Sequence, residues 1–135
     1  MIGQLDTATL TPELSHIRET SMVEVDSDCP MTVDRLLRRM EVLRQRIAVR
    51  WCGVPGAFAG YDQLQIHRDH DGPVGSVTFT CRLIDVGETT HTVEFLASIR
   101  CERDGGAPRV LLRGTGRTLH VSVGGKDGYS TADCA

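Results

Sequence analysis

The chain has 135 residues, of which 40% are hydrophobic and 24% charged, a composition typical of one globular domain. Its formal net charge of −3 argues against non-specific nucleic-acid binding, which requires a basic surface that displaces phosphate counterions. No apolar run approaches the ~20 residues that a membrane span requires. The opening segment "MIGQLDTATLTPELS" lacks the basic and apolar parts of a secretory signal. We therefore expect a cytoplasmic protein that binds neither nucleic acid nor membrane.

The sequence predicts one domain over residues 1–135, because neither an internal repeat nor a linker rich in Pro, Gly or Ser divides it. Residues 1–14 and 124–135 show no hydrophobic periodicity, and we expect both segments to be flexible. The five cysteines are widely spaced without a C-x-x-C pair, which indicates reduced thiols. Cys52 can be read as a nucleophile, but a structural thiol is the favoured interpretation because no base is apparent nearby.

A short strand is predicted over residues 16–25, and a long helix follows it. Thr32 or Asp34 can cap the start of this helix, and the glycines and proline of residues 53–56 end it near Trp51. Apolar residues recur at the spacing of one helical face. They are Val33, Leu36, Leu37, Met40, Leu43, Ile47 and Trp51.

The second half of the chain predicts four further strands, over residues 61–68, 76–86, 91–101 and 109–123. Tight turns, one of them at residues 71–73, are expected to join these strands in sequence. Gly114 and Gly116 are expected to bend the last one. Alternation gives two of the strands a common apolar face, formed by Val77, Phe79, Cys81 and Leu83 and by Val93, Phe95, Ala97 and Ile99. The pattern predicts an α+β fold, with one helix packed on one face of an antiparallel sheet.

In a chain of this length, a central helix against a meandering antiparallel sheet resembles the hotdog fold. Four short motifs are similar to those of the fluoroacetyl-CoA thioesterase-like family, over residues 31–121. Met40-Glu41 within "LLRRMEVLRQRI" resembles the family's Leu-Met-Glu with its catalytic glutamate, and Gly60 precedes His67 by the family's seven residues. The other two motifs are "GPVGSVTFTCRLIDVGE" and "GTGR" at 114–117.

The resemblance implies an acyl thioesterase that hydrolyses an acyl or polyketide thioester of coenzyme A or of an acyl carrier protein, without a cofactor. Glu41, His67 and Thr32 are then the candidate catalytic residues, and Gly60, Val33 and Arg117 the candidate substrate-binding residues. By spacing from the glutamate, the family's threonine falls at Val33 rather than at Thr32. The family's gating phenylalanine has no counterpart in "VDSDCPMT". A hotdog protein that binds an acyl or polyketide chain without cleaving it is therefore the alternative.

Each candidate also has a simpler interpretation. Glu41 can be a helix-flank glutamate paired with Arg38, Arg44 or Gln45. As a base it would gain from partial desolvation, which is expected to raise its pKa. His67 can be a solvent-exposed strand end, or it can orient the glutamate and protonate the leaving thiolate. Gly60 can be a turn residue, or its backbone N–H can approach the thioester carbonyl.

The remaining charged residues suggest contacts to partners. Arg44 lies close to the apolar stripe and is expected to pair with a carboxylate across a subunit interface, while Arg113 and Arg117 are suited to phosphate groups. One hotdog protomer leaves a sheet edge open, so we expect at least a homodimer whose sheets continue across the interface. His70 lies in a turn and is expected at the surface. Three further histidines are isolated and lack metal-ligand spacing, so the sequence predicts no metal site. They are His16, His91 and His120.

Overall fold

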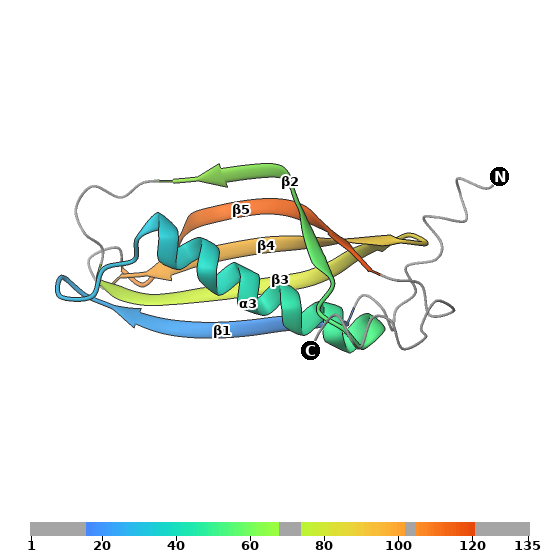
Figure 1. Cartoon of the computed structure of the whole chain (residues 1–135). Coiled ribbons are helices and arrows are strands. Elements are labelled where there is room, and N and C mark those ends of the chain that lie inside the picture. The colour runs from blue at the N-terminus through green and yellow to red at the C-terminus, as the bar shows by residue number, and fades with distance from the viewer. Residues whose placement is uncertain (1–15, 68–73, 102–104, 121–135) are drawn as a thin grey trace.

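The structure, a computed structural model of the chain, describes residues 16–67, 74–101 and 105–120. Its elements in chain order are β1 (Arg18–Val25), α3 (Val33–Cys52), β2 (Ala57–Ile66), β3 (Gly75–Val86), β4 (Thr90–Arg100) and β5 (Pro108–Leu119). Figure 1 shows α3 lying obliquely across one face of a five-stranded sheet. The predicted α+β class is confirmed, whereas the segments predicted to be flexible and the turn at 71–73 lie outside the described residues.

Local sequence explains both ends of α3. Thr32 caps the first turn, where its Oγ1 accepts a hydrogen bond from the backbone N–H of Arg35 at 3.1 Å, as predicted. Gly53 ends the helix in the left-handed conformation, with φ of 87°, and its N–H donates to the carbonyl of Val49. In the part of the chain that the structure describes, no helix is long and apolar enough to cross a membrane.

The strands are ordered β1-β3-β4-β5-β2, and all neighbours are antiparallel. The prediction that tight turns join the last four strands in sequence is therefore wrong for the first pair, because β2 lies beside β5 and not beside β3. The edge of β3 that β2 would need is occupied by β1, which pairs with it from Arg18 opposite Arg82 to Val25 opposite Gly75. The two edges of the sheet are thus β1 and β2.

Two glycines of β5 allow β2 to come so close. A Cβ atom on Gly114 would lie 2.5 Å from the carbonyl oxygen of Gln63, and one on Gly116 would lie 2.8 Å from the ring of Phe58. Phe58 also packs edge-on against Tyr61, which in turn packs against Phe95 of β4. These glycines were predicted to bend β5. In the structure they also leave space for the backbone of β2, at Gly114, and for the ring of Phe58, at Gly116.

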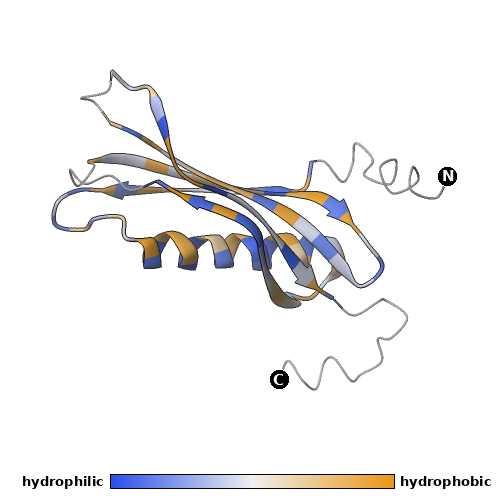
Figure 2. Cartoon of the chain, turned by 90° about the horizontal axis from the view of Figure 1, so that it is seen from above, coloured by the Kyte–Doolittle hydropathy of each residue, from blue (hydrophilic) through white to orange (hydrophobic). Residues whose placement is uncertain are grey.

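The core lies between α3 and the sheet. The predicted inward faces of β3 and β4 are confirmed, since all eight of their residues are at most 1% exposed. Leu36, Met40, Leu43 and Ile47 of α3 are buried against them, whereas Val33, at the start of the predicted stripe, is 39% exposed. Figure 2 shows apolar and polar residues alternating along the strands, as expected for a sheet with one covered face.

Replacing Gly114 with alanine is expected to lower the free energy of unfolding by about 1–3 kcal/mol, the usual cost of overpacking. The new methyl group would collide with the backbone of β2, so the two strands must separate. Chemical denaturation measures the change. Arg113→Ala is the matched control, because Arg113 is exposed and adjacent in β5, and its truncation is expected to cost at most about 0.5 kcal/mol. Equal stability of the two variants would contradict the close approach.

Candidate active site

Glu41 and Arg44 form a two-pronged ion pair on the flank of α3 that faces β2. The Arg44 guanidinium donates from Nε to Oε1 at 2.8 Å and from Nη2 to Oε2 at 2.6 Å. Gln45 adds a third hydrogen bond to Oε2 at 2.9 Å. Arg44 is 2% exposed and Glu41 39% exposed, so the pair joins a buried cation to a carboxylate that solvent can reach.

The pKa of Glu41 is lowered, chiefly because its carboxylate accepts hydrogen bonds from Arg44, with Gln45 and the charge of Arg44 adding to the effect. Partial burial acts in the opposite direction and is outweighed. The prediction that the pKa of Glu41 lies above its ordinary value is therefore wrong. The pairing foreseen for a simple helix-flank glutamate, with Arg44 or Gln45, is present, and Arg44 finds its carboxylate within its own chain rather than across an interface.

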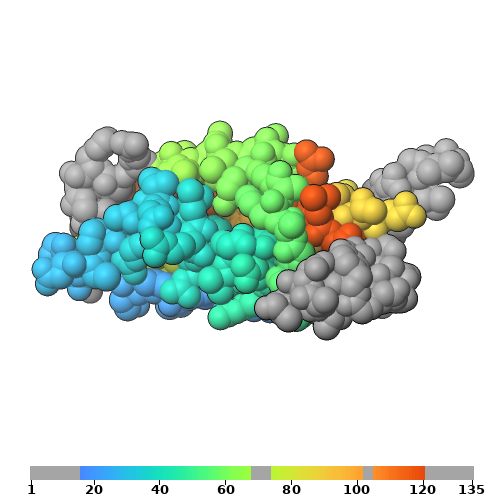
Figure 3. All heavy atoms as spheres, in the orientation of Figure 1, coloured from blue at the N-terminus to red at the C-terminus, as the bar shows by residue number. Residues whose placement is uncertain are grey.

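Arg44 also ties three other parts of the fold to Glu41. The Nη1 atom of Arg44 donates to the carbonyl of Pro55 at 2.9 Å and to Oγ1 of Thr118 at 3.2 Å. Its guanidinium carbon lies 5.6 Å from the centre of the Phe58 ring, within the range of a cation–π contact. The loop before β2, the start of β2 and the end of β5 therefore meet at this one cation. Figure 3 shows α3 and β2 adjoining on the same face of the molecule.

Gly60 lies in β2 beside the Glu41 region. Phe58, two residues before Gly60, contacts the guanidinium that holds Glu41. Burial raises the pKa of Tyr61, which follows Gly60, and the negative charge of Glu41 adds to this rise. Gly60 has φ of 119°, a value that favours glycine, and no heavy atom of the described residues lies within 4 Å of the position a Cβ would take. The backbone conformation at this position therefore requires glycine, and the place of the missing side chain is open.

His67 lies at the other end of β2. It follows the last residue of the strand, its side chain is exposed, and its backbone N–H donates to the carbonyl of Leu111 at 2.8 Å. Gly60 lies opposite Arg117 and His67 opposite Leu111, six residues apart along β5, which amounts to about 20 Å at 3.3 Å per residue. One protomer therefore does not bring Gly60 and His67 to the same point.

The other sequence candidates lie apart from Glu41. Thr32 holds the helix cap, and Val33 is about 12 Å from Glu41 along the axis of α3, at 1.5 Å per residue. Arg117 is paired with Asp62 at 2.9 Å and lies opposite Gly60 in the β2–β5 register. Because its neighbour in β5 points toward Arg44, alternation places Arg117 on the outer face of the sheet. To meet a phosphate it would have to leave Asp62.

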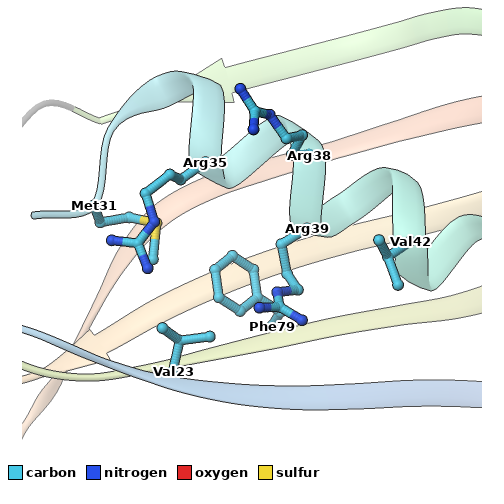
Figure 4. A pocket seen from close by; sticks show the side chains of 7 residues that line it. All are labelled: Val23, Met31, Arg35, Arg38, Arg39, Val42 and Phe79. Carbon is cyan, nitrogen blue, oxygen red and sulfur yellow. The ribbon is translucent and has the colours of Figure 1, made fainter. Parts of the chain in front are cut away.

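A basic cavity of about 300 Å³ lies on the opposite flank of α3, against β1 and β3 (Figure 4). Arg35 donates to the carbonyls of Cys29 and Pro30, and Arg38 pairs with Asp34. Within the described residues, Arg39 makes no hydrogen bond or ion pair. The cavity has the charge to hold an anion, but its lining residues include no carboxylate or histidine. They are Val23, Met31, Arg35, Arg38, Arg39, Val42 and Phe79.

A cluster of His91, His120 and Cys52 was missed by sequence reasoning. The two Nδ1 atoms are 3.1 Å apart, and the three side chains each offer a ligand atom within 4.8 Å of the others. Burial lowers the pKa of His91 to about 4, and the charges of His120 and Arg44 contribute. The prediction that the histidines are isolated is wrong for these two, because β4 begins where β5 ends and Thr90 lies opposite Leu119.

Comparison with known proteins identifies the architecture. The sequence matches no protein-family model, and it matches no curated protein. An acyl-CoA hydrolase from Staphylococcus aureus, solved with butyryl coenzyme A, superposes with a TM-score of 0.68 and 11% identity, covering 84% of this chain and 71% of that one. The hexameric thioesterase from Yersinia pestis gives 0.61 and 12%, covering 80% and 91%. The chain has the hotdog fold.

A third hotdog structure limits what the fold alone implies. A β-alanyl-CoA:ammonia lyase from Clostridium propionicum superposes with a TM-score of 0.62 and 13% identity, covering 76% of this chain and 83% of that one. An ammonia lyase and an acyl-CoA hydrolase thus have similar folds, and both are named for a coenzyme A thioester. The reaction must be argued from the residues of the site.

Glu41→Gln is expected to lower the free energy of unfolding at pH 7 by about 1–3 kcal/mol. Breaking a fully buried pair costs about 3–5 kcal/mol, and solvent at Glu41 reduces this. Because the folded pKa is lowered, the stabilisation is complete above the ordinary value of 4.5 and is lost as the pH falls through the folded pKa. Urea denaturation of both proteins across this pH range measures it.

Glu94→Gln is the matched control for this measurement. Glu94 pairs with Arg82 at 2.8 Å, but both side chains are about two-fifths exposed, and such pairs contribute at most about 1 kcal/mol. A loss of similar size in both variants, or a difference between wild type and Glu41→Gln that does not change with pH, would contradict the special role of Arg44.

Proposed function

We propose that the protein is an acyl thioesterase that hydrolyses a thioester of coenzyme A or of an acyl carrier protein. The observation that carries the proposal is Glu41, an ionised and solvent-reachable carboxylate held at the junction of α3 and β2. Its support comes from the hotdog fold, shared with acyl-CoA thioesterases, one of which was solved with butyryl coenzyme A. The proposed subfamily remains the fluoroacetyl-CoA thioesterase-like one, on the Gly60–His67 spacing and Glu41.

In this proposal, Glu41 acts in its ionised form, which its lowered pKa secures at neutral pH. It either takes the proton of a water molecule that attacks the thioester carbonyl, or attacks that carbonyl itself to form an anhydride that water then opens. The carbon–sulfur bond breaks in either route, and the thiolate leaves. His67 supplies a proton to this thiolate, and the backbone of Gly60 lies near the carbonyl oxygen.

The separation of Gly60 and His67 requires a second subunit in this mechanism. β2 is an edge strand, so its outer side can pair with β2 of another copy, and a two-fold axis makes that pairing antiparallel. With the axis at Leu64, and with the register shift between Tyr61 and Gln63 taken into account, Gly60 lies opposite His67 of the partner subunit. Each active site then combines Glu41 and Gly60 of one chain with His67 of its partner.

A complementation experiment tests this shared site. His67→Ala and Glu41→Gln are each expected to lower kcat by about 10²–10⁴-fold, the usual contribution of a general acid or base. In a mixed dimer, one site keeps both residues and the other loses both. Co-refolding equal amounts should therefore restore roughly a quarter of wild-type activity by statistical mixing.

The same experiment separates the shared site from a site within one chain. If Glu41 and His67 of the same chain worked together, every site of the mixed dimer would lack one of them, and activity would stay at the level of the single variants. His16→Ala is the control, because His16 is exposed and precedes β1. Its kcat should equal that of the wild type. Near-normal turnover in His67→Ala would show that His67 has no catalytic role.

The dimer itself is tested at Leu64. In the ladder, the N–H of His67 points toward β5, so by alternation the N–H of Leu64 points to the open edge. Leu64→Pro removes one donor from the proposed interface without removing a hydrogen bond to β5. We expect this variant to sediment as a smaller species than the wild type at micromolar concentration, whereas Leu64→Val should not. A wild-type monomer would contradict the shared site.

The alternative function is binding of an acyl or polyketide chain without cleavage. The observation that favours it is that both carboxylate oxygens of Glu41 already accept hydrogen bonds from Arg44 and Gln45, as in a purely structural pair. A panel of short, aryl and long acyl-CoA substrates with a thiol reporter distinguishes the two functions. Release of the thiol above background supports hydrolysis. Measurable binding of the same compounds without release supports the binding protein.

A further inference from the structure

The cluster of Cys52, His91 and His120, here called the CHH cluster, lies at one end of the sheet and comes from three separate elements. Cys52 is the last residue of α3, His91 is the second residue of β4, and His120 follows β5. The backbone fixes the histidines relative to each other, because Thr90 pairs with Leu119, and the N–H of His120 donates to the carbonyl of Thr89 at 2.8 Å.

His91 is poorly satisfied by the protein itself. It is 1% exposed, and its Nε2 atom has no hydrogen-bond partner among the described residues. Its Nδ1 atom faces Nδ1 of His120 at 3.1 Å, with the two rings stacked at an interplanar angle of 24°. The two Nδ1 atoms are thus the ring nitrogens that face each other, and an ion bound between them would leave the ring proton of His91 on Nε2.

We infer that the CHH cluster binds a transition-metal ion of the Zn²⁺ class through Cys52 and the two histidines. Thiolate and imidazole are the donors that such ions prefer, and three protein ligands leave a position for water or an external ligand. Metal–nitrogen bonds of 2.0–2.1 Å place two ligand nitrogens of a tetrahedral site about 3.3 Å apart. The observed 3.1 Å between the Nδ1 atoms is close to this value.

The sulfur of Cys52 must exchange its present partners for the ion. Its thiol now donates to the carbonyl of Ala48 at 3.2 Å and lies 3.6 Å from that of Val54. Binding breaks the S–H bond, forms a sulfur–metal bond and releases one proton to solvent, and the resulting thiolate offsets one of the two charges of the ion. The charge of nearby Arg44 is already neutralised by Glu41.

Cobalt(II) is the probe, because a thiolate ligand gives it a charge-transfer absorption band in the near ultraviolet that imidazole alone does not. Titration of the reduced full-length protein should produce this band with one equivalent of Co²⁺ per chain, and Zn²⁺ should displace it. Cys52→Ser should abolish the band. The matched control is Cys29→Ser, since Cys29 is exposed and is not a member of the CHH cluster. It should keep the band.

His120→Ala tests the histidine side of the cluster, because His120 is only half-buried and its loss is less disruptive than that of His91. Loss of a residue that only hydrogen-bonds to a metal ligand weakens metal binding by about 10–100-fold. Loss of a ligand itself should weaken Zn²⁺ binding by at least this much. Wild-type protein should also unfold at a higher temperature with Zn²⁺ present, and His120→Ala should not. A wild type without the cobalt band, or a Cys52→Ser variant that keeps it, would overturn the inference.

Discussion

The hydrogen bonds of the buried Arg44 guanidinium are the interactions on which the rest of this molecule depends. A cation that is 2% exposed must be fully hydrogen-bonded, and Arg44 meets this need with Glu41, Pro55 and Thr118 together. These partners belong to α3, to the loop before β2 and to the end of β5. The hydrogen bonds that satisfy this one charge therefore fix where β2 starts and also hold Glu41 in place. The same residue stabilises the fold and positions the candidate site.

The path of β2 sets the second constraint. Because β1 occupies the edge of β3, β2 must pair with β5 and end as an edge strand, with Gly60 and His67 about 20 Å apart along it. A strand that carries two candidate functional positions at its ends and has an open side is suited to pairing with its own copy. The proposed shared active site follows from this arrangement rather than from any contact within one chain.

Periodicity predicted the helix and the inward faces of β3 and β4, and residue type offered Thr32 or Asp34 as the cap, because these features depend on residues near one another in sequence. Periodicity could not predict that β2 pairs with β5 rather than with β3, since that pairing depends on distant glycines at 114 and 116. The same limit hid the CHH cluster, whose members are far apart in sequence and meet through the β4–β5 register. Arg44 inside an apolar stripe was the available signal for a buried ion pair.

The ion pair between Arg44 and Glu41 also affects proton transfer in the proposed mechanism. If Glu41 took a proton from water, the buried guanidinium would lose the charge that balances it, so the protonated state is unfavourable. That proton must therefore leave quickly. In the proposed mechanism its acceptor is the departing thiolate, and the proposed relay is the imidazole of His67 of the partner subunit. A pair that stabilises the fold through the charge of Glu41 thus favours a reaction in which that charge is restored within each turnover.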